Sequence, residues 1–251
     1  MPGNIKPNQI QIVMFVALIS TATCSIYFNN SRIVFMLKSF TKNFAINISI
    51  KNRQKKYRYF IEQIEPNRNS KILDVGFTED DAYPGVNFLE KNYPYKENIT
   101  ALGIEDAPNF KKNFPEVNVV KYDGSYFPFK DKEFDIAWSN AVIEHVGCHD
   151  KQLLFLSELL RTSKSIFITT PNRWFPIEVH TRLPFLHFLP KKYFDKILPL
   201  FSKAWAAGDY MNLLSVSDVK KMLKQLNVKK YTIKRNRKFF ATMDFVLIVR
   251  Q

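Results

Sequence analysis

The sequence predicts an α/β protein: a doubly wound sheet of seven strands that ends in an antiparallel hairpin. Five short apolar runs in the middle of the chain each end in a polar or turn residue, with helical patterns between them. Two more strand-like runs close the chain with no helix between them, so we expect them to pair as a hairpin. Hydrophobic residues make up 46% of the chain, which provides for a sizeable core and argues against disorder.

The first apolar run, residues 72–75 within KILDVG, is too short for a helix and suits a buried strand. Asp74 interrupts this run, and Gly76 follows where the chain should turn. A buried carboxylate is costly unless something pairs with it. The carboxyl end of the first strand in a doubly wound sheet opens onto the ligand crevice. We therefore expect a cofactor to lie over Asp74 and Gly76.

The next four runs also end in polar or turn residues. We expect strands over residues 99–104, 117–122, 134–138 and 165–170, followed by Glu105, by Asp123 and Gly124, by Ser139 and Asn140, and by Pro171 and Asn172. Because the carboxyl ends of parallel strands form one edge of an open α/β sheet, these groups should line a single site.

Helical patterns and turns separate the strands. We expect helices over residues 53–64, ended by Pro66, over residues 86–93, after a cap at Asp150, and from Ser215 with Asp218 in a capping box. The final strands should cover residues 228–234 and 240–249, joined by the basic turn KRNRK.

The N-terminal segment, residues 1–50, is apolar and basic, and residues 51–251 form the predicted domain. Residues 12–28 carry no charge, so residues 10–28 are at the lower limit for a helix that spans a bilayer. The positive charges follow this run, which predicts a single N-terminal membrane anchor with the domain on the cytoplasmic side. The alternatives are a cleaved signal peptide and an apolar helix packed on the domain.

The formal charge of +14 favours an anionic partner: nucleic acid, an acidic membrane face or a phosphorylated substrate. The lysine-rich C-terminal part fits a solvated face, and without a recognisable RNA-binding module we do not expect a nucleic-acid partner. Cys24 and Cys148 have no metal-like spacing, so we expect neither a disulfide framework nor a metal site. The acidic loop at residues 79–81 argues against a pyrophosphate cofactor such as NAD and suits a cationic or zwitterionic one.

Three motifs carry a resemblance to a known family. LDVG at residues 73–76, GIE at residues 103–105 and YDGSYFPFKDKEFDIAWSNAVIEHV at residues 122–146 resemble the class I S-adenosylmethionine-dependent methyltransferases, particularly their type 11 branch. The resemblance covers residues 71–172 and implies a Rossmann-like fold, methyltransferase activity and S-adenosylmethionine as cofactor. One departure is that the family's glycine-rich loop, D-x-G-x-G-x-G, is reduced here to Asp74-Val75-Gly76.

The resemblance also implies how the cofactor is held. It assigns the methionine part to Asp74 and the backbone around Gly76, the ribose diol to Glu105, the adenine to Asp123 and Gly124, and the methyl-transfer channel to Ser139 and Asn140.

A hydroxyl acceptor would require a base, and histidine is the usual choice. His180 lies in an aromatic and proline-rich loop after the fifth strand, where a substrate lid is expected, and is our first candidate. Glu178 would orient it or bind sugar hydroxyls. His145, just past the fourth strand, is the second catalytic candidate. The alternatives are that His145 only caps its helix and that Glu178 is a solvated loop acid.

The loop after the fifth strand also suggests the acceptor. Its aromatic residues could stack on a sugar or a lipid. Its sequence resembles bacterial methyltransferases associated with surface-polysaccharide and lipid-linked glycan assembly. We therefore expect O-methylation of a sugar or lipid-linked glycan intermediate at the cytoplasmic membrane face. The alternatives are a methyltransferase of a quinone or other small hydrophobic molecule, and a non-catalytic methyltransferase-like membrane protein that has lost the cofactor.

Overall fold

The computed structural model describes residues 32–238 and 240–251 of the chain. The chain divides into two compact units, residues 1–53 and 54–251. The predicted anchor and apolar helix over residues 10–28 lie outside the described residues. Within the described part of the chain, no helix is both long enough and apolar enough to cross a membrane.

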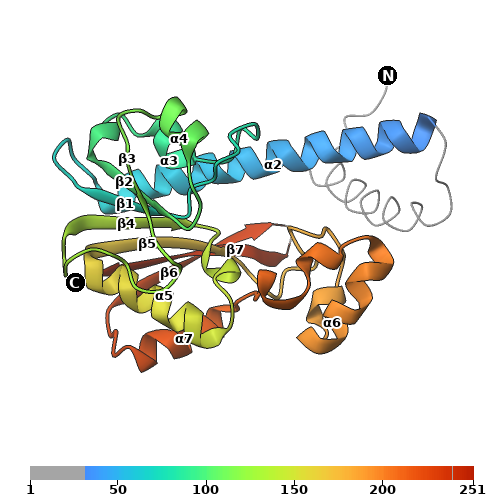
Figure 1. The fold of residues 1–251 in the computed structure, drawn as a ribbon. Coiled ribbons are helices and arrows are strands. Elements are labelled where there is room, and N and C mark those ends of the chain that lie inside the picture. Colours follow the sequence, from blue (N-terminus) through green and yellow to red (C-terminus); the bar gives the residue numbers. More distant parts are fainter. Residues whose placement is uncertain (1–31, 239) are drawn as a thin grey trace, which may run out of the picture. The chain divides into compact units, whose positions relative to one another are not determined.

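The second unit is built on one seven-stranded sheet with the strand order β3-β2-β1-β4-β5-β7-β6 (Figure 1). The strands are β1 (Ile72–Val75), β2 (Ile99–Gly103), β3 (Asn118–Lys121), β4 (Phe134–Asn140), β5 (Ser163–Pro171), β6 (Tyr231–Lys238) and β7 (Ala241–Arg250). The first five pair in parallel, and β7 is antiparallel to both β5 and β6. The predicted doubly wound sheet and its C-terminal hairpin are therefore confirmed. The strand order reverses between β1 and β4, which is where such sheets bind ligands.

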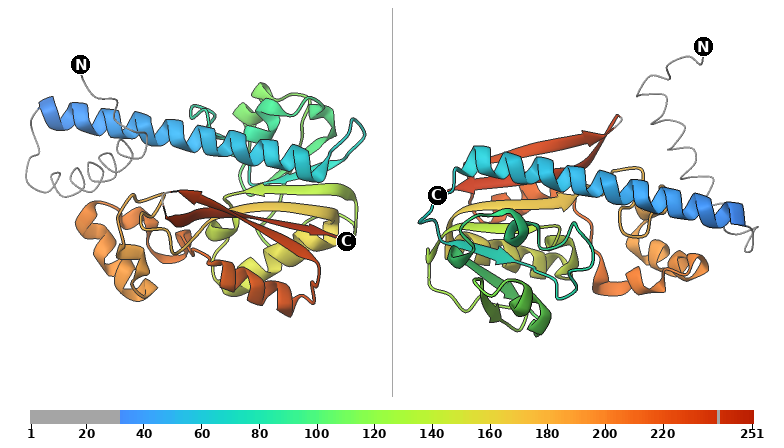
Figure 2. Two further views of the ribbon diagram at one scale, coloured as in Figure 1. Left: turned by 180° about the vertical axis from the view of Figure 1, so that it is seen from behind. Right: turned by 90° about the horizontal axis from the view of Figure 1, so that it is seen from above.

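Helices cover both faces of this sheet (Figure 2). The last part of α2 (Arg32–Ile64), α3 (Phe88–Asn92) and α4 (Pro108–Asn113) pack on one face, and α5 (His149–Thr162) and α7 (Val216–Gln225) on the other. Side chains alternate along a strand. Leu73 and Val75 accordingly join the core beneath α5 and α7, while Ile72 joins the core beneath α2 and α3. Asp74, two residues after Ile72, is thereby turned toward the α2 and α3 face.

The helix boundaries follow local chemistry. Helix α2 ends at Ile64, just before Pro66, as predicted, and Ser215 and Asp218 form the predicted capping box of α7. Two expectations need correction. Helix α5 begins after Cys148, which places Asp150 in its first turn instead of at the cap. There its negative charge interacts favourably with the positive end of the helix dipole. The predicted helix over residues 86–93 shortens to the five residues of α3.

The C-terminal hairpin turns later than predicted. The basic residues of KRNRK belong to β6 instead of forming the turn, and the register shifts between Asn236 and Arg237. Asn236 is buried, and its side-chain amide donates to Asp244 of β7 at 3.2 Å. This cross-strand bond extends the ladder through a stretch that charge alone would assign to a loop.

The segment between β5 and α7 forms a small helical subdomain with a core of its own. It contains α6 (Lys191–Ile197) and several short 3₁₀ turns. Its hydrophobic core is formed by Leu183, Phe194, Leu198, Ala206 and Met211. We call residues 172–214 the cap segment. Because it follows β5, it lies at the edge of the sheet where the parallel strands end.

Candidate active site

The acid of the first strand is buried beside a second acid. Asp74 is 5% exposed, and Glu90 of α3 is fully buried. The carboxyl of Glu90 forms a hydrogen bond with the carboxyl of Asp74 and with no other described residue. Burial raises the pKa of Asp74 well above its usual value, and the nearby charge of Glu90 raises it further. Burial likewise raises the pKa of Glu90. Two adjacent buried acids that form no ion pair with a described residue favour a positively charged ligand.

Neighbouring side chains pack closely against the backbone at the end of β1 and β2. Gly76 has φ +103°, and a Cβ built there would lie 2.3 Å from Cγ2 of Val142. A Cβ at Gly103 would lie 2.6 Å from the ring of Phe77. Both glycines therefore make room for a neighbouring side chain. That the backbone at Gly76 also contacts a cofactor stays a prediction.

The acids of the loop after β1 form hydrogen bonds and an ion pair with the neighbouring helices α3 and α4. Glu79 accepts hydrogen bonds from the backbone amides of Asn109 and Phe110 in α4, at 2.8 and 3.1 Å. Asp81 pairs with Lys91 at 2.7 Å. These acids hold the loop to α3 and α4. The acids left for a cationic ligand are therefore Asp74 and Glu90.

The acids after β2 and β3 lie in different surroundings from Asp74. Glu105 is exposed and helps to line a pocket of about 360 Å³ together with residues of α4 and β3. Asp123 is also exposed, and its Oδ1 accepts bonds from the backbone amide and the hydroxyl of Ser125 at 2.9 and 2.5 Å. These bonds lower the pKa of Asp123. Gly124 follows with φ +84°, and a Cβ there would meet only Ile104, at 3.7 Å.

The two polar residues at the end of β4 are engaged with neighbouring strands. The buried hydroxyl of Ser139 donates to the carbonyl oxygen of Val75 at 3.1 Å. Oδ1 of Asn140 accepts from the hydroxyl of Thr169 at 2.5 Å. Their side chains thus join β4 to β1 and β5. The next residue, Ala141, has φ +60°, a strained conformation for a non-glycine residue that concentrates at functional sites.

The two catalytic candidates lie against each other, although they are 35 positions apart in the sequence. Nε2 of His145 lies 3.1 Å from Nε2 of His180. Nδ1 of His180 lies 2.7 Å from Oε1 of Glu178, and Nδ1 of His145 lies 2.8 Å from the carbonyl oxygen of Tyr210. The structure thus brings together His145, His180 and Glu178.

Glu178 is the anchor of this group. It is 2% exposed. Burial alone would raise the pKa of its carboxyl, but hydrogen bonds from His180 and Thr181 outweigh burial and lower that pKa to about 2. The backbone amide and the hydroxyl of Thr181 donate to Oε2 at 2.5 and 2.7 Å. The carboxylate is therefore ionised and fixed in place, which contradicts the alternative of a solvated loop acid.

Glu144 lies next to the two histidines, and the sequence analysis did not predict it as a site residue. It is fully buried; its Oε2 accepts from the hydroxyl of Thr170 at 2.9 Å, and its Oε1 has no hydrogen-bond partner among the described residues. The ligand atoms of Glu144, His145 and His180 lie within 4.8 Å of one another. The only sequence signal for Glu144 was its position directly before His145.

Glu90 is the second site residue that the sequence analysis did not predict. No sequence signal pointed to it, because its burial depends on where α3 packs.

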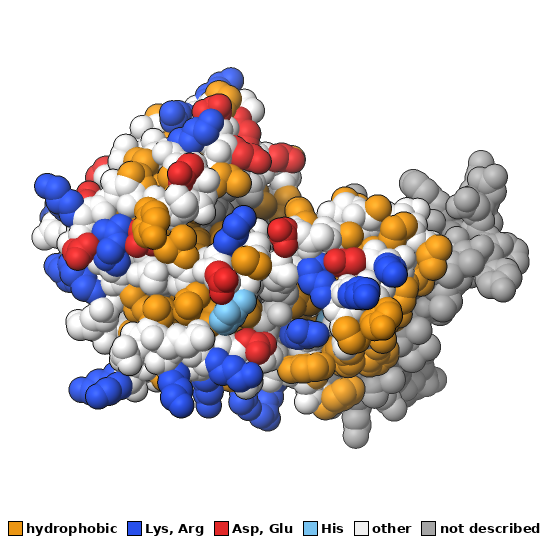
Figure 3. All heavy atoms as spheres, turned by 60° about the horizontal axis from the view of Figure 1, so that its bottom comes forward, with side chains coloured by type: hydrophobic (Ala, Val, Ile, Leu, Met, Phe, Trp, Pro, Cys, Tyr) orange, Lys and Arg blue, Asp and Glu red, His pale blue; other side chains and the backbone are white. Residues whose placement is uncertain are grey.

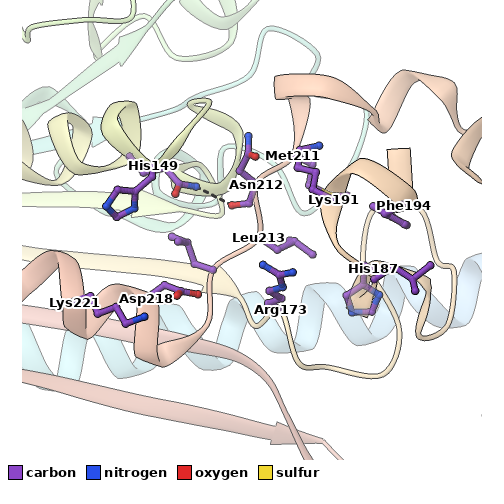
Figure 4. A pocket seen from close by; sticks show the side chains of 13 residues that line it. His149, Arg173, His187, Lys191, Phe194, Met211, Asn212, Leu213, Asp218 and Lys221 are labelled. Atoms are coloured by element: carbon purple, nitrogen blue, oxygen red, sulfur yellow. Dashed lines mark hydrogen bonds between the residues drawn. The ribbon is translucent and has the colours of Figure 1, made fainter. Parts of the chain in front are cut away.

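A pocket of about 250 Å³ opens between α5, α7 and the cap segment. Figure 4 shows Arg173 in the middle of this pocket, with Asp218 and Lys221 of α7 on one side and His187 and Phe194 on the other. Asp218 is engaged in the capping box of α7. The buried Nε of Arg173 has no hydrogen-bond partner among the described residues. The pocket therefore combines basic groups with apolar walls.

Similarity to known proteins gives separate evidence on the function of this chain. Residues 87–165 match a family model described as a methyltransferase domain. No curated protein is similar enough in sequence to match the chain. Among solved structures, the chain is similar to an S-adenosylmethionine-dependent methyltransferase from Mesorhizobium loti, with 12% identity, 76% of this chain and 95% of that chain covered, and a TM-score of 0.50.

It is also similar to the methyltransferase domain of bacterial CtHen1-CN, with 13% identity, 80% of this chain and 99% of that chain covered, and a TM-score of 0.50. At these identities the structural likeness concerns the fold, and the sequence match to the family model concerns the central part of the chain. The family match supports a methyltransferase enzyme, the structural likeness supports its fold, and S-adenosylmethionine is the cofactor on which the Mesorhizobium loti protein depends.

Proposed function

We propose that this methyltransferase transfers a methyl group to a hydroxyl oxygen of an acceptor that carries both an anionic and an apolar part, such as a sugar in a lipid-linked glycan intermediate. The observation that carries the proposal is the hydrogen-bonded row of Glu178, His180 and His145 after β4 and β5. A row of this kind suits proton removal from a hydroxyl.

The residues at the strand ends fit the cofactor. S-adenosylmethionine supplies an activated methyl group on a cationic sulfur when it is bound. Asp74, together with the adjacent Glu90, would take the ammonium of the methionine part, because no described residue forms an ion pair with either buried acid. Glu105 is exposed and would accept from the ribose diol. Asp123 and Gly124 would border the adenine.

The histidines would receive the acceptor's proton. Glu178 accepts from Nδ1 of His180 and thereby leaves Nε2 as the basic nitrogen of that ring. The carbonyl oxygen of Tyr210 does the same for His145. Ser139 and Asn140 would shape the channel beside them by holding β4 against its neighbours. Much of the rate would come from alignment of the acceptor oxygen with the methyl group.

The pocket beside α7 supports an acceptor with two kinds of surface. Arg173 and Lys221 would bind a phosphate group, while Phe194, Met211 and Leu213 would contact apolar atoms. The cap segment also exposes large apolar side chains: Trp174, Phe185, Tyr193, Leu200 and Trp205. Figure 3 shows apolar side chains gathered around α6, at the right of that view. Such a surface suits a lipid-bearing acceptor at a membrane face.

The test is to incubate the purified chain with methyl-labelled S-adenosylmethionine and a detergent extract of bacterial membrane lipids. The proposal expects label in glycolipids that release it with the sugar on mild acid hydrolysis. The Arg173→Gln variant should need more acceptor for half-maximal rate, whereas Arg182→Gln serves as the matched control because Arg182 is not among the residues that line the pocket. Label confined to quinones would favour the alternative substrate, and an extract without label would contradict the proposal.

A further inference from the structure

We propose that Glu144, His145 and His180 bind a divalent transition-metal ion. The inference rests on the proposed function, because it names what occupies the histidine pair of that same site. The sequence gave no reason to expect a metal, since its cysteines lack metal-like spacing. The three ligands come from two segments that meet only in the folded chain.

The hydrogen bonds of the two rings carry the first step of the argument. The partner of His145 Nδ1 is a carbonyl oxygen, which can only accept, so this nitrogen bears the proton. The partner of His180 Nδ1 is a carboxylate, so the same holds there. The two Nε2 atoms are therefore the ring nitrogens that face each other, 3.1 Å apart, where one proton shared between them makes a hydrogen bond. A metal ion beside them would take the place of that proton and accept both Nε2 lone pairs.

Glu144 supplies the second, independent observation. Its side chain is fully buried, and its Oε1 has no hydrogen-bond partner among the described residues. The oxygen and nitrogen ligands of the three residues lie within 4.8 Å of one another. A buried carboxylate oxygen without a donor, next to two Nε2 atoms that face each other, leaves a position for one positive ion.

The distances suit a metal. Bonds of about 2.0–2.1 Å from a metal to two adjacent imidazole nitrogens place those nitrogens roughly 3 Å apart, close to the 3.1 Å observed between the two Nε2 atoms. Two imidazoles and one carboxylate favour zinc, iron or a neighbouring transition metal over magnesium or calcium, which prefer oxygen ligands. Three protein ligands leave positions open for an oxygen atom of the acceptor.

Each ligand is also held by a neighbour. Glu178 orients His180, the carbonyl oxygen of Tyr210 orients His145, and the hydroxyl of Thr170 donates to Oε2 of Glu144. Supporting bonds of this kind fix the tautomer and orientation of metal-binding side chains. A metal-bound hydroxyl loses its proton more readily, so with both Nε2 atoms on the ion the histidine pair would act through the metal, and the acceptor's proton would pass to solvent.

The experiment is to strip metals from the full chain with a chelator and titrate it with zinc chloride in a calorimeter. Cobalt(II) chloride, which gives visible absorption bands that depend on its ligands, is the second probe. We expect one ion per chain, and binding at least about 10-fold weaker in His180→Ala and in Glu178→Gln. His149→Ala is the matched control and should bind as the wild type does. Circular dichroism checks that each variant folds.

Equal zinc affinity in the wild type and in His180→Ala would overturn the inference. So would the absence of zinc and cobalt binding in a wild-type chain that still binds S-adenosylmethionine, a result that would leave the proposed function standing with a proton in place of the metal. Metal binding by a chain that binds no S-adenosylmethionine would instead contradict the proposed function and keep the metal site.

Discussion

Nδ1 of His180 lies 2.7 Å from Oε1 of Glu178, and this short bond joins the ring to a carboxylate that is almost fully buried. The carboxylate also accepts from the backbone amides of His180 and Thr181. Glu178 therefore holds both the tautomer of the ring and the path of the loop that carries it. In the neutral ring this bond places the proton on Nδ1, which leaves Nε2 available for proton transfer or metal binding.

Glu178→Gln should therefore lower the rate of methyl transfer by about 10- to 100-fold, because the amide can donate to Nδ1 and so favour the wrong tautomer. The rate is measured with labelled S-adenosylmethionine at saturating acceptor. Asp195→Asn is the matched control, since Asp195 is an acid of the same cap segment that pairs with Lys191 at 2.9 Å. Equal rates in wild type and Glu178→Gln would exclude this role.

The acids at the end of β1 predict a pH effect on stability. Burial and Glu90 raise the pKa of Asp74, so the folded protein keeps a proton that the unfolded chain releases above about pH 4. This contribution is fully present below that pH and is lost as the pH rises through the raised pKa. Urea unfolding should show that the free energy of unfolding of the cofactor-free wild type falls with rising pH relative to Asp74→Asn. A difference that does not change with pH would contradict the buried pair.

Gly76 offers a test of the closed turn after β1. Gly76→Ala forces a side chain into φ +103° and against Val142, and the backbone strain alone costs roughly 1 to 3 kcal/mol. Gly208→Ala is the matched control, because Gly208 has φ +69° with no atom near its missing Cβ. Thermal unfolding should show the larger loss at Gly76, and Val142→Ala added to Gly76→Ala should restore part of it. Equal losses at both glycines would show that Val142 does not press on this turn.

The capping box of α7 gives a purely structural prediction. The Ser215 hydroxyl accepts from the backbone amide of Asp218 at 3.2 Å, and the Asp218 carboxylate accepts from the amide of Ser215 at 2.9 Å. Ser215→Ala should lower the free energy of unfolding by about 1 kcal/mol, as measured in urea. Ser217→Ala changes an exposed serine of the same helix and should have little effect. Indistinguishable variants would show that the cap contributes nothing.

Local sequence pattern was enough to predict most of the sheet. The apolar runs at β1 to β5 are short and end in polar residues, so period and punctuation locate them without knowledge of the fold. The hairpin turn was misplaced because its basic residues resemble a loop, whereas the backbone ladder with β7 and the bond between buried Asn236 and Asp244 hold them in β6. Short α3 was overestimated because its ends depend on packing, not on a cap.

The candidate site was also predicted only in part from the sequence. Asp74, Glu105 and Asp123 could be proposed because strand ends meet at one sheet edge, but the sequence could not show that Asp74 is buried beside Glu90 while Asp123 is exposed. The contact between His145 and His180 depends on how the cap segment folds back. No local pattern predicts such a contact, because the loop that makes it has neither helical nor strand period.

The most direct test of the central claim is calorimetric titration of the full chain with S-adenosylmethionine. The wild type should bind, and Asp74→Asn should bind roughly 10- to 100-fold more weakly, as expected for a lost hydrogen bond between charged groups. Asp131→Asn, which changes an exposed acid paired with Arg161 at 2.9 Å, should bind like the wild type. Absence of binding by the wild type, or equal binding by Asp74→Asn, would contradict the assignment of this sheet edge to the methyl donor.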